Sequence, residues 1–141
     1  MSIRNPKHIA VDFLSRRDHS VRELQAKLRK KGMGDQDIAE TIDWLKEKKL
    51  LDDRVFAAKR AEALFRSKPV GPKWIEAKLR AAGISQNIVD DVVGSLATEQ
   101  EWNERSKKAI AAWKKVHPKY ADDTIRHQRF LMSRGFMGGE Y

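Results

Sequence analysis

The sequence contains no cysteine, which excludes disulfide bonds and thiolate metal sites. It also contains no apolar run of the roughly 18 residues that a membrane-crossing helix needs. The N-terminal residues are polar and lead into no apolar segment of the signal-peptide type. From these absences we expect a soluble, cytoplasmic protein with no membrane partner.

Motifs that hold phosphate or metal are absent as well. Neither G-x-x-x-x-G-K-[ST] nor G-x-G-x-x-G occurs. Paired aspartates at 52–53, 90–91 and 122–123 raise the possibility of acid–base chemistry. Two of these pairs stand where helix N-caps are expected, and the pair at 90–91 falls on the solvent side of a helix. We therefore expect no catalytic residue, no metal and no cofactor, and a protein that is not an enzyme.

The histidines lack the spacing of metal ligands, and each is expected at the surface or at a helix end. They are His8, His19, His117 and His127.

Positive charge, in contrast, is abundant. The chain has 29 Lys and Arg against 20 Asp and Glu, a net charge of +9 at pH 7. This balance favours a polyanionic partner such as nucleic acid or a nucleoprotein. Charged residues make up 35% of the chain, so surface is plentiful relative to core. That proportion favours an elongated, repetitive shape over a compact sphere.

Apolar residues recur at helical spacing along nearly the whole chain, which predicts an all-α fold. Ser20 and Thr98, each with Glu three residues later, form capping-box patterns. The expected N-caps are Asp35, Asp52 or Asp53, Gly71, Ser85, and Asp122 or Asp123, and the expected helix ends include Gly32, Gly83 and Gly135. The residues expected to face inward include Ile9, Phe13, Leu14, Val21, Leu24, Leu28, Ile38, Ile42, Leu45, Phe56, Ala57, Leu64, Ile75, Leu79, Ile88, Val92, Leu96, Trp102, Ala109, Trp113, Val116, Ile125 and Leu131.

An internal repeat organises these helices. Residues 20–33 and 71–84 share the tetrapeptide Ala-Lys-Leu-Arg and a following glycine at the same offset of 51. Residues 131–136 align with 79–84 at an offset of 52. A three-helix unit of about 50 residues buries little surface alone, so neighbouring units should stack.

We accordingly predict tandem three-helix repeats over residues 1–52, 53–97 and 98–141. The third repeat is expected to be truncated after its second helix. Its apolar face over residues 124–136 then packs on the second repeat, stays mobile, or forms a dimer interface. We expect a monomer.

The distribution of charge recurs with the same period. Residues 54–80 carry eight Lys and Arg and two Asp and Glu, whereas residues 81–102 carry four acidic and no basic residues. Repeats stacked in one orientation would form one long basic face. Alternatively, basic helices pack beside acidic ones and the charges interleave.

The candidate partner-binding or DNA-binding residues on the basic face are Arg22, Lys27, Arg29, Lys30, Lys31, Lys59, Arg60, Arg66, Lys68, Lys73, Lys78 and Arg80. Some of these side chains are equally compatible with lying along the helix surface. Trp74 joins the set as a candidate exposed aromatic, since it sits beside Lys73 and one turn from Lys78. A ring there could stack on a base, worth ~1–3 kcal/mol, or simply flank the apolar stripe.

Three motifs resemble those of the RecX family, bacterial modulators of the RecA recombinase. The first is Arg17-Asp18-His19-Ser20 with Glu23-Leu24. The second combines Leu50-Leu51-Asp52-Asp53, Phe56-Ala57 and Ser67-Lys68-x-x-Gly71-Pro72. The third is Gln128-x-Phe130-Leu131-x-x-Arg134-Gly135-Phe136. Together they span about residues 9–136.

The resemblance implies a curved array of three three-helix repeats that binds in the groove of the RecA–DNA filament. It implies inhibition of ATP hydrolysis, strand exchange and co-protease activity, and hence modulation of DNA repair, DNA recombination and the SOS response. It also implies weak binding to single-stranded and double-stranded DNA. Two alternatives stay open: a general helical DNA- or RNA-binding protein that acts without a recombinase, and a protein-interaction scaffold with no nucleic-acid role.

Overall fold

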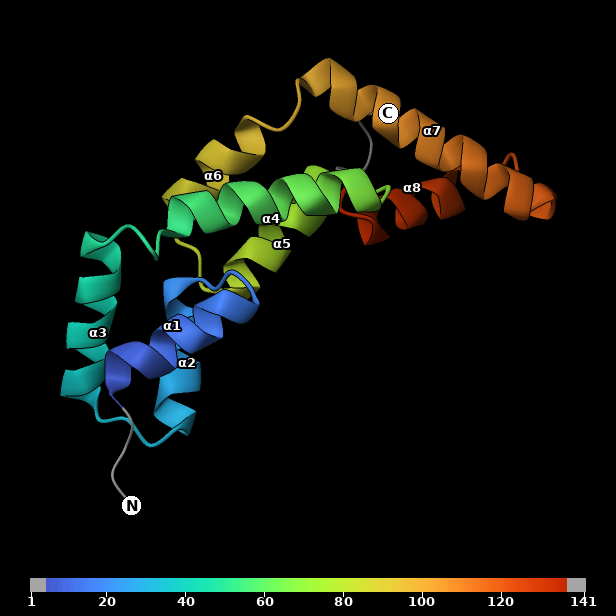
Figure 1. Ribbon diagram of the computed structural model, residues 1–141. Helices are drawn as coiled ribbons and strands as arrows, with labels where there is room; N and C mark the ends of the chain where they lie inside the picture. Colours follow the sequence, from blue (N-terminus) through green and yellow to red (C-terminus); the bar gives the residue numbers. More distant parts are fainter. Residues whose placement is uncertain (1–4, 137–141) are drawn as a thin grey trace.

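The computed structural model describes residues 5–136, and within this range it contains eight α-helices, one short 3-10 helix and no strand. Figure 1 shows the helices following one another along an open arch, with α1–α3 at one end and α7 and α8 at the other. The predicted all-α fold of tandem helical repeats is therefore confirmed.

The helices are α1 (Pro6–Arg16), α2 (Val21–Lys30), α3 (Asp35–Glu47), α4 (Asp53–Ser67), α5 (Pro72–Ala81), α6 (Gln86–Gly94), α7 (Glu99–Val116), the 3-10 helix η1 (Pro118–Tyr120) and α8 (Thr124–Ser133). They pack in three groups: α1–α3, α4–α6, and α7 with η1 and α8. The repeat limits 1–52, 53–97 and 98–141 stay predictions, and residues 137–141 lie outside the described range.

Local sequence signals set the helix ends. Ser20 and Thr98 both form reciprocal capping boxes with the glutamate three residues on. Gly32, Gly83 and Gly135 follow α2, α5 and α8 with φ of 87°, 86° and 85°, the left-handed conformation that ends a helix at little cost in glycine. The same type of ending recurs after α3, where Lys49 adopts φ of 58°.

Two predicted caps differ in detail. Gly34 is the N-cap of α3, and Asp35 is its first helical residue. Ser85 does occupy the N-cap of α6, but its hydroxyl lies 2.7 Å from the side-chain oxygen of Asn87 and caps no backbone N–H.

The buried apolar residues form two separate cores. The first joins α1, α2 and α3 around Leu24, Leu28 and Leu45. The second runs through α4–α8, and it includes Leu131 and Phe136 from the last group. Backbone bonds reinforce this packing, because the Gly71 N–H donates to the Arg134 carbonyl at 2.7 Å. Of the three alternatives for the face over residues 124–136, packing on the second repeat is the one observed in the described residues.

Several inward positions were predicted wrongly. In α6 the fully buried side chains are Val89 and Val93, whereas Ile88 and Val92 are half-buried. Both rows have helical spacing, so periodicity did not distinguish them. Ile125 in α8 is 64% exposed. It stands six residues from the buried Leu131, which places the two side chains about 120° apart around the helix.

The aromatic predictions were partly right. Trp102 is buried, as expected, whereas Trp113 is half-buried and Val116 is 75% exposed. The latter two side chains line an open groove instead of the core.

His19 and His127 are buried, contrary to the expected surface positions. Each has a backbone carbonyl within hydrogen-bonding distance of a ring nitrogen, which explains how a buried imidazole is accommodated.

Candidate partner-binding surface

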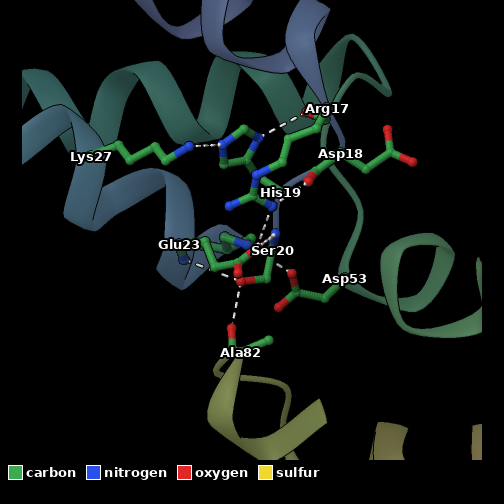
Figure 2. A network of polar contacts seen from close by, with 9 residues as sticks. Arg17, Asp18, His19, Ser20, Glu23, Lys27, Asp53 and Ala82 are labelled. Atoms are coloured by element: carbon green, nitrogen blue, oxygen red, sulfur yellow. Dashed lines mark hydrogen bonds and ion pairs between the residues drawn. The ribbon is translucent and has the colours of Figure 1, made fainter. Parts of the chain in front are cut away.

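The joint between the first and second groups is polar (Figure 2). The Ser20 hydroxyl donates to the carbonyl oxygen of Ala82 at the end of α5. The Val21 N–H donates to the Asp53 carboxylate at 2.8 Å. Because the two apolar cores do not merge here, the orientation of α1–α3 relative to α4–α6 depends on these directional hydrogen bonds.

One close approach adds to the joint. A Cβ built on Gly83 would lie 2.5 Å from both Cβ and Cδ of Arg22, closer than carbon atoms can pack. Glycine at this position therefore allows the start of α2 to lie directly on the end of α5. Arg22, a predicted partner-binding residue, uses its aliphatic part for this contact.

Beside the joint lies a recess of about 590 Å³, here called the inter-repeat recess. Its lining residues are Arg17, Asp18, Glu23, Phe56, Lys59, Arg60, Ala63, Lys78, Ala81 and Ala82. Three predicted basic residues, Lys59, Arg60 and Lys78, thus meet here. Its lining carries more basic than acidic side chains, an excess that favours an anionic group.

The acidic side chains of the recess are already engaged. Asp18 lies 3.7 Å from the Lys59 ammonium, and Glu23 lies 3.3 Å from the Arg17 guanidinium. These contacts neutralise part of the positive charge, in line with the interleaved alternative for these four residues. Arg60 and Lys78 provide the remaining positive charge of the recess.

Trp74 lies close to two of the predicted lysines. The ammonium groups of Lys78 and Lys68 are 4.9 Å and 5.6 Å from the Trp74 ring, at cation–π distance. Trp74 is half-buried, and the backbone of Gly135 lies against its backbone and Cβ. Its use as a base-stacking ring stays a prediction.

The other predicted residues are dispersed. Arg29, Arg66 and Lys73 form ion pairs with Asp35, Glu62 and Glu76. Lys30 and Arg80 are exposed. The inter-repeat recess therefore contains only part of the predicted set, and the role of each residue stays a prediction.

Lys27 and Lys31 lie over the ring of Phe13, and Lys27 also contacts His19. The His19 ring has its Nδ1 2.9 Å from the Arg17 carbonyl and its Nε2 2.8 Å from the Lys27 ammonium. A carbonyl only accepts and an ammonium only donates, so a neutral imidazole protonated on Nδ1 satisfies both. Burial lowers the pKa of His19, and the nearby charges of Arg17 and Lys27 act in the same direction.

Sequence reasoning did not single out Arg17 and Asp18 as recess residues, although both stand in the first quoted motif. It also missed Arg105, whose guanidinium donates to the Val70 carbonyl at 3.0 Å and to the carbonyls of Phe65 and Lys68. Nothing in the sequence distinguishes this arginine from its basic neighbours. Only the packing of α7 on the loop after α4 reveals its role.

No group of three or more His, Cys, Asp or Glu side chains in residues 5–136 could hold a metal ion. Nor is any helix of that range long and apolar enough to cross a membrane. The array of helical units joined through a polar contact defines the class, a helical-repeat protein.

Family models identify the repeats more specifically. The model of the RecX first three-helix domain matches residues 7–45, and that of the RecX second three-helix domain matches residues 52–93. The chain belongs to the RecX family of regulatory proteins.

Several curated relatives carry the name regulatory protein RecX. The protein of Chlorobaculum tepidum is 34% identical over 130 residues, which cover 90% of this chain and 78% of that one. The Chlorobium limicola protein is 33% identical, with 90% and 79% covered. The Bacillus licheniformis protein is 30% identical, with 90% of this chain but 49% of that protein covered. This chain thus spans about half the length of the Bacillus relative.

Solved structures show the same fold. The crystal structure of RecX from Lactobacillus salivarius superimposes with a TM-score of 0.85 at 23% identity, covering 93% of this chain and 86% of that one. A second crystal structure of regulatory protein RecX gives a TM-score of 0.84 at 21% identity, covering 93% and 65%.

Proposed function

We propose that this protein binds the RecA–DNA filament and inhibits the recombinase, lowering ATP hydrolysis, strand exchange and co-protease activity. It thereby modulates DNA repair and the DNA-damage response. Membership of a regulatory family supports the proposal, and the observation that carries it is the inter-repeat recess.

A nucleoprotein filament presents phosphates and carboxylates along its length, and both suit a basic recess. Arg60 and Lys78 come from α4 and α5, whereas the opposite wall comes from the α1–α2 connection. A partner seated in the recess therefore contacts two repeats at once and fixes the angle between them. Contact on both sides of a joint makes binding sensitive to the spacing of groups along the partner.

The test measures DNA-dependent ATP hydrolysis by the cognate RecA on single-stranded DNA while this protein is titrated in. We expect the rate to fall at comparable or lower concentration than RecA. An unchanged rate with a correctly folded sample would overturn the proposal.

Charge reversal locates the contact. Arg60→Glu and Lys78→Glu should each weaken inhibition by about tenfold in concentration, since every 1.4 kcal/mol of binding is tenfold. Lys115→Glu is the matched control, because Lys115, like Lys78, is an exposed lysine in the last turn of its helix but lies outside the recess. Equal loss in all three variants would indicate a general charge effect without a specific contact.

The alternative is a nucleic-acid-binding protein that acts without a recombinase. The observation in its favour is the pair of ammonium groups beside the Trp74 ring, an arrangement suited to a single strand. It predicts tight binding to DNA alone, with an affinity that falls steeply with salt, at a log–log slope of about −0.7 to −0.9 per phosphate contacted. Binding that requires RecA on the DNA would count against it.

A further inference from the structure

A second hollow, here called the outer groove, lies between the C-terminal end of α4, α7 and α8, and shares no lining residue with the inter-repeat recess. Its volume is about 740 Å³. The floor is apolar and comes from three elements: Phe65 of α4, Ala112, Trp113 and Val116 of α7, and Phe130 of α8. Contiguous exposed apolar surface rimmed by polar residues is typical of an interaction site.

The rim of the outer groove carries charge of one sign. Arg66, Lys68, Lys108 and Arg134 line it, and among residues 5–136 no carboxylate does. Arg66 reaches a glutamate, Glu62, but that residue lies outside the groove lining. The groove therefore combines an apolar floor with a basic edge, and its ligand should combine apolar groups with negative charge.

The walls of the groove are held in place by internal contacts. The three hydrogen bonds from Arg105 to backbone carbonyls fix the end of α4 and the loop after it against α7. On the other side, the His117 ring stacks on Trp113 with centroids 4.4 Å apart, and Phe130 lies 5.9 Å from the same indole. A groove formed in advance binds at a lower entropic cost than one that the ligand must organise.

We propose that the outer groove docks an acidic amphipathic α-helix of a partner protein. Such a helix presents apolar side chains at i, i+3, i+4 and i+7 to the floor, and carboxylates on its flanks reach the basic rim. This inference does not rest on the proposed action on RecA, because the groove and its charge are independent of the inter-repeat recess.

Single-stranded nucleic acid fits the same groove less well. The faces that bases would stack on are already in use: Arg105 lies 4.0 Å from the centre of the Phe65 ring, Arg134 lies 5.5 Å from that of Phe130, and His117 covers Trp113. Aliphatic side chains need no free ring face, and Ala112 and Val116 provide surface for them.

A second copy of this chain is also a poor occupant. Its most acidic described helix is α3, with Asp35, Asp37, Glu40, Asp43 and Glu47. The apolar side of α3, formed by Ile38, Ile42 and Leu45, is buried in the first core and cannot enter a groove. The partner is therefore a different protein.

The test uses a fluorescent peptide of about 16 residues, roughly four helical turns, and the full-length chain. The peptide has Leu at i, i+3, i+4 and i+7, Glu on the flanks of that stripe, and Ala elsewhere. Fluorescence anisotropy should show saturable binding that weakens as salt is raised. Replacing every Glu by Gln, or every Leu by Ser, should each weaken binding by about tenfold.

Two protein variants probe the groove itself. Val116→Glu and Lys108→Glu should each weaken binding by about tenfold, since one places charge on the floor and the other reverses the rim. The matched controls are Ile125→Glu, a comparably exposed apolar residue outside the groove, and Lys107→Glu, the neighbouring lysine outside it. Both controls should bind like the parent protein. Because all four side chains are exposed, each variant should retain the helical circular dichroism and melting temperature of the parent.

Three results would overturn the proposal. The first is no binding of the peptide, or binding unchanged in both groove variants. The second is displacement of the peptide by oligo(dT) through the same residues, with tighter binding of the DNA than of the peptide, which would assign the groove to nucleic acid. The third is self-association that is abolished by Val116→Glu, which would make the groove an interface between copies of this chain. None of these outcomes depends on RecA.

Discussion

The hydroxyl of Ser20 donates a hydrogen bond to the carbonyl oxygen of Ala82, 62 residues further along the chain. Ser20 is the N-cap of α2, and Ala82 is the C-cap of α5. The same hydroxyl accepts a bond from the N–H of Glu23 at 3.1 Å. One small side chain thus caps the start of a helix in the first repeat and donates to the carbonyl at the end of a helix in the second.

Replacing Ser20 by Ala should destabilise the protein by about 1–3 kcal/mol, because it removes the cap and leaves the Ala82 carbonyl without this donor. Thr98→Ala is the matched control, since Thr98 caps α7 with the same capping-box geometry but is exposed. It should cost about 1 kcal/mol. Urea unfolding followed by circular dichroism measures both, and equal losses would show that the Ser20–Ala82 bond contributes nothing.

Gly83→Ala should be more destabilising than Gly32→Ala. Both glycines have the same left-handed conformation, which costs about 1–2 kcal/mol for a residue with a Cβ. Only at Gly83 would that Cβ collide with Arg22, since nothing lies within 4 Å of the corresponding position at Gly32. The difference between the two losses in free energy of unfolding measures the cost of the collision with Arg22. Adding Arg22→Ala should reduce the cost of Gly83→Ala, and strict additivity would argue against a collision.

Lys49→Gly should stabilise the protein by up to about 1 kcal/mol. Lys49 has φ of 58° after α3, in the conformation that glycine adopts after α2, α5 and α8. Its gain is smaller than the full strain because glycine also makes the unfolded chain more flexible. Lys48→Gly is the control, because Lys48 has φ of −80° and no strain to relieve. Lys48→Gly should destabilise the protein. A gain in stability from both substitutions would indicate that the lost lysine charge, and not the backbone conformation, is the cause.

Arg105→Met should destabilise the packing of α7 on α4 by about 2 kcal/mol, because three backbone carbonyls lose a charged donor while most of the apolar stem is kept. Lys107→Met, two residues further along α7 and exposed, should change the free energy of unfolding by less than about 0.5 kcal/mol. Hydrogen exchange should show faster opening of α7 and α8 in Arg105→Met, with α1–α3 unchanged. Uniform acceleration across the chain would contradict a local role.

Acidification should destabilise the protein partly through His19. Burial lowers the pKa of His19 in the folded state below its ordinary value of 6.5. The unfolded chain therefore binds the proton more readily than the folded protein does. The resulting stability is complete above about pH 6.5 and is lost as pH falls through the folded-state pKa. Comparing urea midpoints of the parent and His19→Gln between about pH 7.5 and 5 should show a shallower pH dependence in the variant.

The sequence predicted features that a few adjacent residues determine. The capping boxes at Ser20 and Thr98 and the glycine ends at Gly32 and Gly83 depend on hydrogen bonds within one turn, so the pattern alone identified them. The family followed because these local signals recur in order along the chain.

Features that depend on how helices meet were not predictable in the same way. For α6, periodicity predicted that Ile88 faces inward, whereas the adjacent residue Val89 does. Both belong to apolar rows along the helix, and only the packing of the neighbouring helices determines which row is buried. The meeting of Arg60 and Lys78 in one recess, and the position of Arg105, likewise depend on the angles between helices. No local pattern encodes such an angle.

The two unmerged cores also determine how the array responds to mechanical load. The stretch α4–α8 shares one continuous apolar core, whereas α1–α3 has a core of its own and meets that stretch at the polar joint. Hydrogen bonds break over a smaller displacement than a packed interior, so bending or tension between the two ends concentrates at Ser20 and Ala82. A partner that twists or stretches would therefore bend the protein at this joint before it deforms either core.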